Sequence, residues 1–307
     1  FIIQEVLELM EKENFYMVEN TVDGKFFVTA RGWEDLSEIL KSYEELQVEI
    51  GEELIGEFLQ KEEIARDFAG YYRLYEKYKS DYQIQEILDG NVISGQLKTC
   101  CDMGKKASFE ERFTVTEMLL EAVTERISSF QKTDEKTEKL YRNLKLLKVF
   151  LQEKNSVEAM EQFIVSRRKA LDAKICSELL TAEEAAREEE QIRILEEYFF
   201  QLKELHISDV AEGIEQIGER FGNVCRLRNE KLEETKKMLE QAFSFLEECF
   251  GEGQELLLFE TGLTGDDRCS IFISQYGCPS YFKHCELLLY SKKENELRKE
   301  CRDLLED

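Results

Sequence analysis

Arg31 is the side chain whose type and position most clearly suggest chemistry. It follows Thr29 in the stretch FVTARGWEDLSEIL, residues 27–40, where Thr29 is predicted to cap a helix by accepting a hydrogen bond from a free backbone N–H. The helix dipole disfavours a cation in this first turn, whereas the exposed N–H groups favour a phosphate. A guanidinium adds a permanently charged, two-pronged donor. The pattern therefore predicts an anion contact, with a solvated surface arginine as the alternative.

Other motifs for catalysis or metal binding are missing from the sequence. There is no GxxxxGK[ST] phosphate loop, because MGKK at 103–106 lacks the first glycine, and there is no HExxH motif. The chain has only two histidines, so few residues are available for acid–base catalysis by histidine. Potential zinc ligands gather near the end of the chain, at Cys269, Cys278, His284, Cys285 and Cys301. Their spacing fits no zinc finger, so we predict packing residues and no metal site.

The composition is that of a strongly acidic helical protein of about two domains. Of the 307 residues, 42% are hydrophobic, 35% are charged and one is proline, which favours long solvated helices. A net charge of −25 repels phosphate backbones and argues against nucleic-acid binding. No apolar run approaches the ~18 residues of a membrane span. The nine scattered cysteines include no CxxC pair, so we predict reduced thiols in a cytoplasmic protein.

Residues 1–90 are predicted to form a small helical module with one β-hairpin. Residues 2–13 have helical spacing, and FYMVENTVDGKFFVT alternates apolar and polar residues around an Asp23-Gly24 turn. Further helices are expected at EELIGEFLQ, at 62–79 and at YQIQEILDGN. The side chains expected to face the core from the helix after Thr29 are Trp33, Leu36, Ile39, Leu40 and Tyr43. Those expected from 62–79 are Ile64, Phe68, Tyr71, Leu74, Tyr75 and Tyr78.

Residues 91–108 lack a period and contain two glycines, which predicts a linker. Beyond it, 109–307 is predicted to form long antiparallel, coiled-coil-like helices and a compact helical tail, so the fold is mainly α. Helices are expected over 109–132, 135–153, 156–180 and 209–250, and the capping box TAEE at 181–184 begins another. The basic run Arg167-Arg168-Lys169 is interpreted as a solvated helix face with acidic partners.

The stretch TARGWEDLSEIL resembles the sensor-2 segment of MoxR-like AAA+ ATPases, which often reads Thr-Pro-Arg-x-Trp-Glu. Thr29, Arg31, Trp33 and Glu34 match that pattern, and Ala30 replaces the frequent proline. The stretches EEIARDFAGYYRLYEKY, FLEECFGEGQELLLFETGLT and YGCPSYFKHCELLLY are similar to the carboxy-terminal half of a bacterial subgroup of these ATPases. The resemblance therefore touches most of the chain.

The resemblance implies an AAA+ lid over 1–90 and a helical extension over 109–307, with Arg31 contacting the nucleotide phosphates. It also implies an upstream ATPase core that binds ATP and Mg²⁺ through Walker motifs, and a chain that begins at Phe1 rather than Met fits such a piece. A hexameric ring, a chaperone-like remodelling role and partners with a von Willebrand factor A domain are implied as well. This piece alone is expected neither to hydrolyse ATP nor to hold a cofactor. The alternative, from another class, is a freestanding helical scaffold without nucleotide chemistry.

Overall fold

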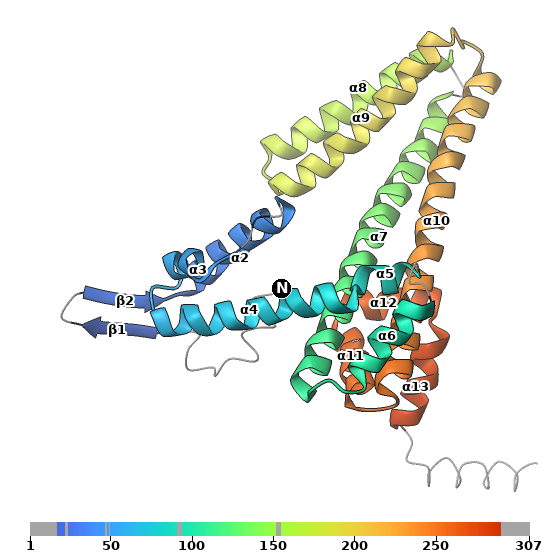
Figure 1. Ribbon diagram of the computed structural model, residues 1–307. Helices are drawn as coiled ribbons and strands as arrows, with labels where there is room; N and C mark the ends of the chain where they lie inside the picture. The colour runs from blue at the N-terminus through green and yellow to red at the C-terminus, as the bar shows by residue number, and fades with distance from the viewer. Residues whose placement is uncertain are drawn as a thin grey trace, which may run out of the picture. The chain divides into compact units, whose positions relative to one another are not determined.

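The computed structural model describes residues 17–21, 24–46, 48, 50–90, 94–151 and 155–289, and they are mainly helical (Figure 1). The predicted helix over 2–13 and the predicted turn residue Asp23 lie outside the described residues. The chain divides into two compact units. Unit 1 holds the described residues up to Glu125 and those from Lys237 onward, and unit 2 is Arg126–Lys236. No described helix combines the length and the apolar character needed to cross a membrane.

The first part of unit 1 is built from two strands and four helices. The strands β1 (Met17–Thr21) and β2 (Gly24–Val28) pair antiparallel where the sequence predicts a hairpin. The helices are α2 (Ala30–Glu45), α3 (Glu52–Phe58), α4 (Glu62–Tyr82) and α5 (Ile84–Asp89). Their shared core contains Val28, Trp33, Leu36, Leu40, Ile55, Leu59, Ile64, Ala65, Phe68, Ala69 and Tyr72. We call this part the N-terminal module.

The inward face of α4 differs from the prediction. Tyr71 and Leu74 were expected to face the core, but they are 37% and 46% exposed. Tyr72 is buried instead, and its ring stacks on Phe68 with the centroids 6.4 Å apart. The face with Tyr71 and the face with Tyr72 both have helical spacing and lie about 100° apart. Because tyrosines occur on both faces, hydrophobicity alone does not show which one is buried.

The predicted linker is wrong, because most of it is a helix. Helix α6 (Ser94–Gly104) occupies the stretch and packs against the end of α10 (Val210–Phe250). The approach requires glycine at 104, where a Cβ atom would lie 2.9 Å from a ring carbon of Phe250. Contacts with a distant helix hold α6 in place, and periodicity within 91–108 alone does not reveal them.

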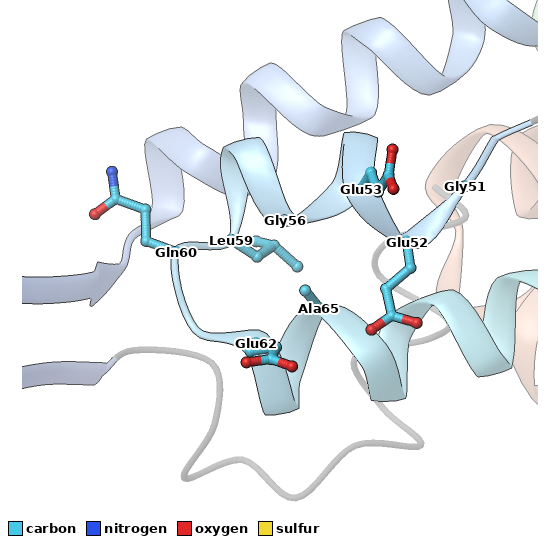
Figure 2. A pocket seen from close by; sticks show the side chains of 8 residues that line it. All are labelled: Gly51, Glu52, Glu53, Gly56, Leu59, Gln60, Glu62 and Ala65. Carbon is cyan, nitrogen blue, oxygen red and sulfur yellow. The ribbon is translucent and has the colours of Figure 1, made fainter.

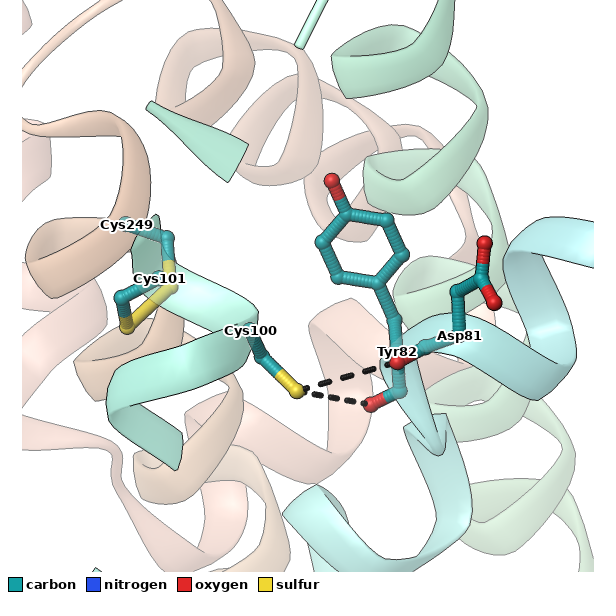
Figure 3. Close-up of a disulfide and its surroundings, with 5 residues drawn as sticks. All are labelled: Asp81, Tyr82, Cys100, Cys101 and Cys249. Carbon is teal, nitrogen blue, oxygen red and sulfur yellow. Dashed lines mark hydrogen bonds between the residues drawn. A yellow bond between two sulfur atoms is a disulfide. The ribbon is translucent and has the colours of Figure 1, made fainter. Parts of the chain in front are cut away.

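Cys101 of α6 and Cys249 of α10 are joined by a disulfide (Figure 3). The preceding Cys100 points elsewhere, because successive helical residues are rotated by about 100°. Its Sγ donates to the carbonyl of Tyr82 at 3.7 Å, and burial raises the pKa of this thiol. The prediction of nine reduced thiols is therefore wrong for the Cys101–Cys249 pair, which is separated by 148 residues in the sequence.

Unit 1 also contains three short helices near the end of the described chain, α11 (Gln254–Gly265), α12 (Asp267–Tyr276) and α13 (Pro279–Leu289). The breaks between them are only one or two residues long. Asp266 separates α11 from α12, and Gly277 ends α12 with a φ of 77°, where glycine is favoured. The Asp266 carboxylate caps α12 by accepting hydrogen bonds from the backbone N–H of Arg268 and of Cys269, at 2.8 and 3.1 Å.

Removing this cap should measurably destabilise unit 1. We expect Asp266→Ala to lower the free energy of unfolding by about 1 kcal/mol, because two backbone donors lose their acceptor. Asp266→Asn keeps a side-chain oxygen at the cap and is the matched control, with a much smaller loss. Urea denaturation of the three proteins compares them. The Asp266 carboxylate also pairs with the guanidinium of Arg268 at 2.7 Å, and equal losses in both variants would assign the effect to this ion pair rather than to capping.

Unit 2 consists of parts of two long helices and a helical hairpin. Helix α7 (Phe109–Leu151) runs antiparallel to α10, because Asp134 pairs with Arg228 and, further along α7, Tyr141 stacks on Phe221. Helix α8 (Ser156–Cys176) and helix α9 (Ala182–Glu204) also pack antiparallel. The core of unit 2 is formed mainly by α7, α8 and α9 together. It includes Leu140, Leu147, Leu151, Met160, Phe163, Leu171, Ile192, Leu195, Tyr198, Phe199 and Leu202.

In unit 2 the predicted capping box is confirmed, whereas the predicted break in α7 is wrong. The capping box is confirmed, since Thr181 and Glu184 exchange both of its hydrogen bonds. The predicted break between 132 and 135 is wrong, and α7 continues through it. The Thr133 hydroxyl donates to the Ser129 carbonyl within the helix, at 3.0 Å. Thr133 and Asp134, the two residues of the predicted break, do not interrupt a helix whose other face is buried.

Candidate functional site

The start of α2 places Arg31 in solvent on a capped helical turn. Thr29 has an extended backbone, and its hydroxyl oxygen accepts a hydrogen bond from the Gly32 N–H at 3.1 Å. Arg31 is the second residue of the helix, and its side chain is 87% exposed. Its Nε lies 3.7 Å from a carboxylate oxygen of Asp35, which is itself 54% exposed. Such exposed pairs contribute little, so the guanidinium can exchange Asp35 for another anion.

The helical turn that carries Arg31 is fixed in place by buried side chains of the same helix. Trp33 is 3% exposed and Leu36 is fully buried, so both anchor α2 in the core of the N-terminal module. Gly32 also matters, because a Cβ there would lie 2.8 Å from the carbonyl oxygen of Phe58, at the end of α3. This role of Gly32 was not predicted from the sequence. A glycine in the first turn of an otherwise well-formed helix was the available signal.

A depression of about 730 Å³ lies between α3 and α4 in the same module (Figure 2). Its rim carries Glu52, Glu53 and Glu62. Arg66 pairs with two of them, since its guanidinium lies 3.4 Å from Glu52 and 2.7 Å from Glu62. An acidic rim of this kind repels phosphate groups. The depression is therefore unsuited to hold the anion that Arg31 would meet.

Two of the cysteines that the sequence offered as zinc ligands, Cys269 and Cys278, are buried and kept protonated. Cys269 shares a hydrogen bond with the Thr124 hydroxyl, and burial raises its pKa to about 11. Cys278 donates to a Glu240 oxygen at 3.1 Å, and burial raises its pKa to about 12. Metal ligation and nucleophilic attack both need the thiolate. Among the described residues no group of side chains could hold a metal ion, and Cys301 lies outside them.

His284 belongs to a buried polar cluster rather than to an open site. Its ring is 2% exposed, stacks on Phe243 and shares a hydrogen bond with Glu247. Burial acts to raise the pKa of Glu247, whereas hydrogen bonds from Lys283 and His284 act to lower it. Together the hydrogen bonds outweigh burial, so the pKa lies below its ordinary value. Burial also raises the pKa of Glu260. Because the His284 side chain itself is almost fully buried, a structural role is indicated for it.

Thr29 and Arg31 are thus the predicted site residues that share one local structure, while Cys269, Cys278 and His284 are buried in the core of unit 1. No protein-family model, curated protein or solved structure matches the chain.

Proposed function

We propose that this chain is the carboxy-terminal part of a MoxR-like AAA+ ATPase, with the N-terminal module as the lid. Arg31 is the sensor-2 residue and contacts the phosphates of ATP that an upstream core binds together with Mg²⁺. The long helices α7 and α10 and the hairpin of α8 and α9 form the extension that engages the protein to be remodelled. A hexameric ring and a partner with a von Willebrand factor A domain belong to the same proposal.

The observation that carries the proposal is an exposed arginine on a rigid, capped helix start. The exposed N–H groups of the first turn and the guanidinium of Arg31 both favour an anion at the same place. Because Trp33 and Leu36 are buried, the backbone turn that carries Arg31 moves together with the module. A phosphate contact at Arg31 would therefore link the presence of the γ-phosphate to the orientation of the lid.

The proposal is tested by steady-state ATP hydrolysis of the full-length gene product. A charge-assisted hydrogen bond contributes about 1.5–3 kcal/mol, or about 10- to 150-fold in an equilibrium. Arg31→Ala should therefore lower ATP turnover by at least about 10-fold. Arg31→Lys should recover part of the loss, because an ammonium group cannot make the two-pronged contact.

Lys41→Ala is the matched control, since Lys41 is an exposed cation at the other end of α2. It should leave turnover unchanged, and thermal melting of all three variants should stay close to that of the unmodified protein. The alternative, a helical scaffold without nucleotide chemistry, expects no ATP hydrolysis in the full-length protein. Normal hydrolysis in Arg31→Ala would remove the sensor-2 role.

A further inference from the structure

A small pocket in unit 2 is lined by cations from two helices, in a protein whose net charge is −25. It lies among α7, α8 and α9 and has a volume of about 260 Å³. Lys139 and Arg142 come from α7, and Arg167 and Lys174 come from α8. We call it the α7–α9 pocket. Glu188 of α9 is the one carboxylate among its lining residues.

Two of the four cations have no acidic partner within the described residues. Lys174 pairs with Glu188 at 2.6 Å, and Arg142 pairs with a glutamate one turn earlier on its own helix. The guanidinium of Arg167 instead donates to the neutral amide oxygen of Asn143. Lys139 makes no ion pair or hydrogen bond in the described part of the chain. The pocket therefore carries an uncompensated positive charge.

The carboxylate of Glu184 does not neutralise Lys139. Its Oε2 accepts hydrogen bonds from both the backbone N–H and the hydroxyl of Thr181 in the capping box. These bonds are the main reason why the pKa of Glu184 is lowered, with smaller contributions from Arg187 and Lys139. The capping geometry holds this carboxylate at the start of α9, so an anion in the α7–α9 pocket would not have to displace it.

A buried acceptor without a partner also lines the pocket. Gln191 is 5% exposed, and its Nε2 donates to the carbonyl oxygen of Lys136 at 3.3 Å. This bond fixes the amide, and the other amide atom, Oε1, is buried with no hydrogen-bond partner. A buried acceptor without a hydrogen bond destabilises the folded protein. A ligand hydroxyl that donated to this oxygen would remove that cost and so gain binding free energy. The cations and Gln191 thus point to one ligand with two kinds of group.

We propose that the α7–α9 pocket binds a small phosphate monoester that carries a free hydroxyl group. The phosphate takes its hydrogen bonds from Lys139 and Arg167, and the hydroxyl donates to Oε1 of Gln191. Water occupies about 30 Å³ per molecule in the liquid, so the pocket holds roughly nine such volumes. That space suits an ester of a few carbon atoms. The residues that line this pocket all belong to unit 2, whereas Arg31 belongs to unit 1, so the site is separate from the ATP contact proposed for Arg31.

Isothermal titration calorimetry of the chain with glycerol 3-phosphate, at low salt, tests the proposal. Saturable binding is expected, and Lys139→Gln or Arg167→Gln should each weaken it by about 10-fold or more, as for the loss of a charge-assisted hydrogen bond. Lys148→Gln is the matched control, because Lys148 is an exposed cation about two and a half turns along α7 and so on its opposite side. It should bind as the unmodified protein does.

A second probe isolates the contribution of Gln191. Methyl phosphate lacks the hydroxyl, so the unmodified protein should bind it several-fold more weakly than glycerol 3-phosphate, and Gln191→Leu should abolish that preference. Lys139 is exposed, so its variant decides the question even if the Arg167 variant fails to fold. The absence of saturable binding, or an equal loss in Lys139→Gln and Lys148→Gln, would overturn the proposal.

Discussion

Replacing Phe68 by alanine should lower the free energy of unfolding of the N-terminal module by about 3–5 kcal/mol. Phe68 is fully buried in α4, where its ring meets the edge of Trp33 with the centroids 5.3 Å apart. Removing the ring forfeits both the burial of its apolar surface and these ring contacts, and it leaves a cavity that the surrounding helices fill incompletely. Domains of this size are commonly stable by only about 5–15 kcal/mol, so the module would come close to unfolding.

Trp33 makes the measurement specific, because it is the one tryptophan of the chain and lies in the same core. Urea denaturation followed by its fluorescence reports on the module alone. Tyr71→Ala is the matched control, since Tyr71 lies three residues further along α4 and is 37% exposed. It should cost well under half as much. A loss of similar size in both variants would place the core on the other face of α4.

Breaking the Cys101–Cys249 disulfide should lower the free energy of unfolding by about 2–5 kcal/mol. The bond spans 148 residues, so in the unfolded state it restricts a large part of the chain. Chemical denaturation with and without a reductant measures the difference. The Cys101→Ser/Cys249→Ser double variant should reproduce the reduced protein and should no longer respond to the reductant.

Cys176→Ser is the control for this pair, because Cys176 is an exposed free thiol and its replacement should leave the effect of the reductant intact. Titration of the denatured, unreduced protein should find two thiols fewer than its nine cysteines. If all nine react and the reductant shifts nothing, the two sulfurs are neighbours without a bond between them.

The features that the sequence predicted correctly are local ones. The capping positions of Thr29 and Thr181 depend on residues within one turn. The exposure of Arg31 follows from the same short stretch. Its proposed phosphate contact depends on a partner beyond the described residues, so it stays a prediction from the resemblance.

The features that the sequence did not predict depend on distant contacts. Helix α6 and the disulfide need the end of α10, which lies far along the chain. The α7–α9 pocket is lined by side chains from three helices, and the sequence of one helix does not show which residues of the others lie nearby. The run Arg167-Arg168-Lys169 was therefore interpreted as a solvated face. That interpretation holds for Arg168, which pairs with Glu196, whereas Arg167 turns toward Asn143. No periodicity within a single helix distinguishes these two directions.

The disulfide also changes the covalent topology of the polypeptide. The oxidised chain is a closed ring between Cys101 and Cys249, which contains all of unit 2, with a linear arm on either side. A single protease cut inside the ring opens it without releasing any fragment, whereas a cut in an arm shortens the protein at once. Partial digestion analysed on paired gels, with and without reductant, therefore assigns each cleavage site to the ring or to an arm before any fragment is sequenced.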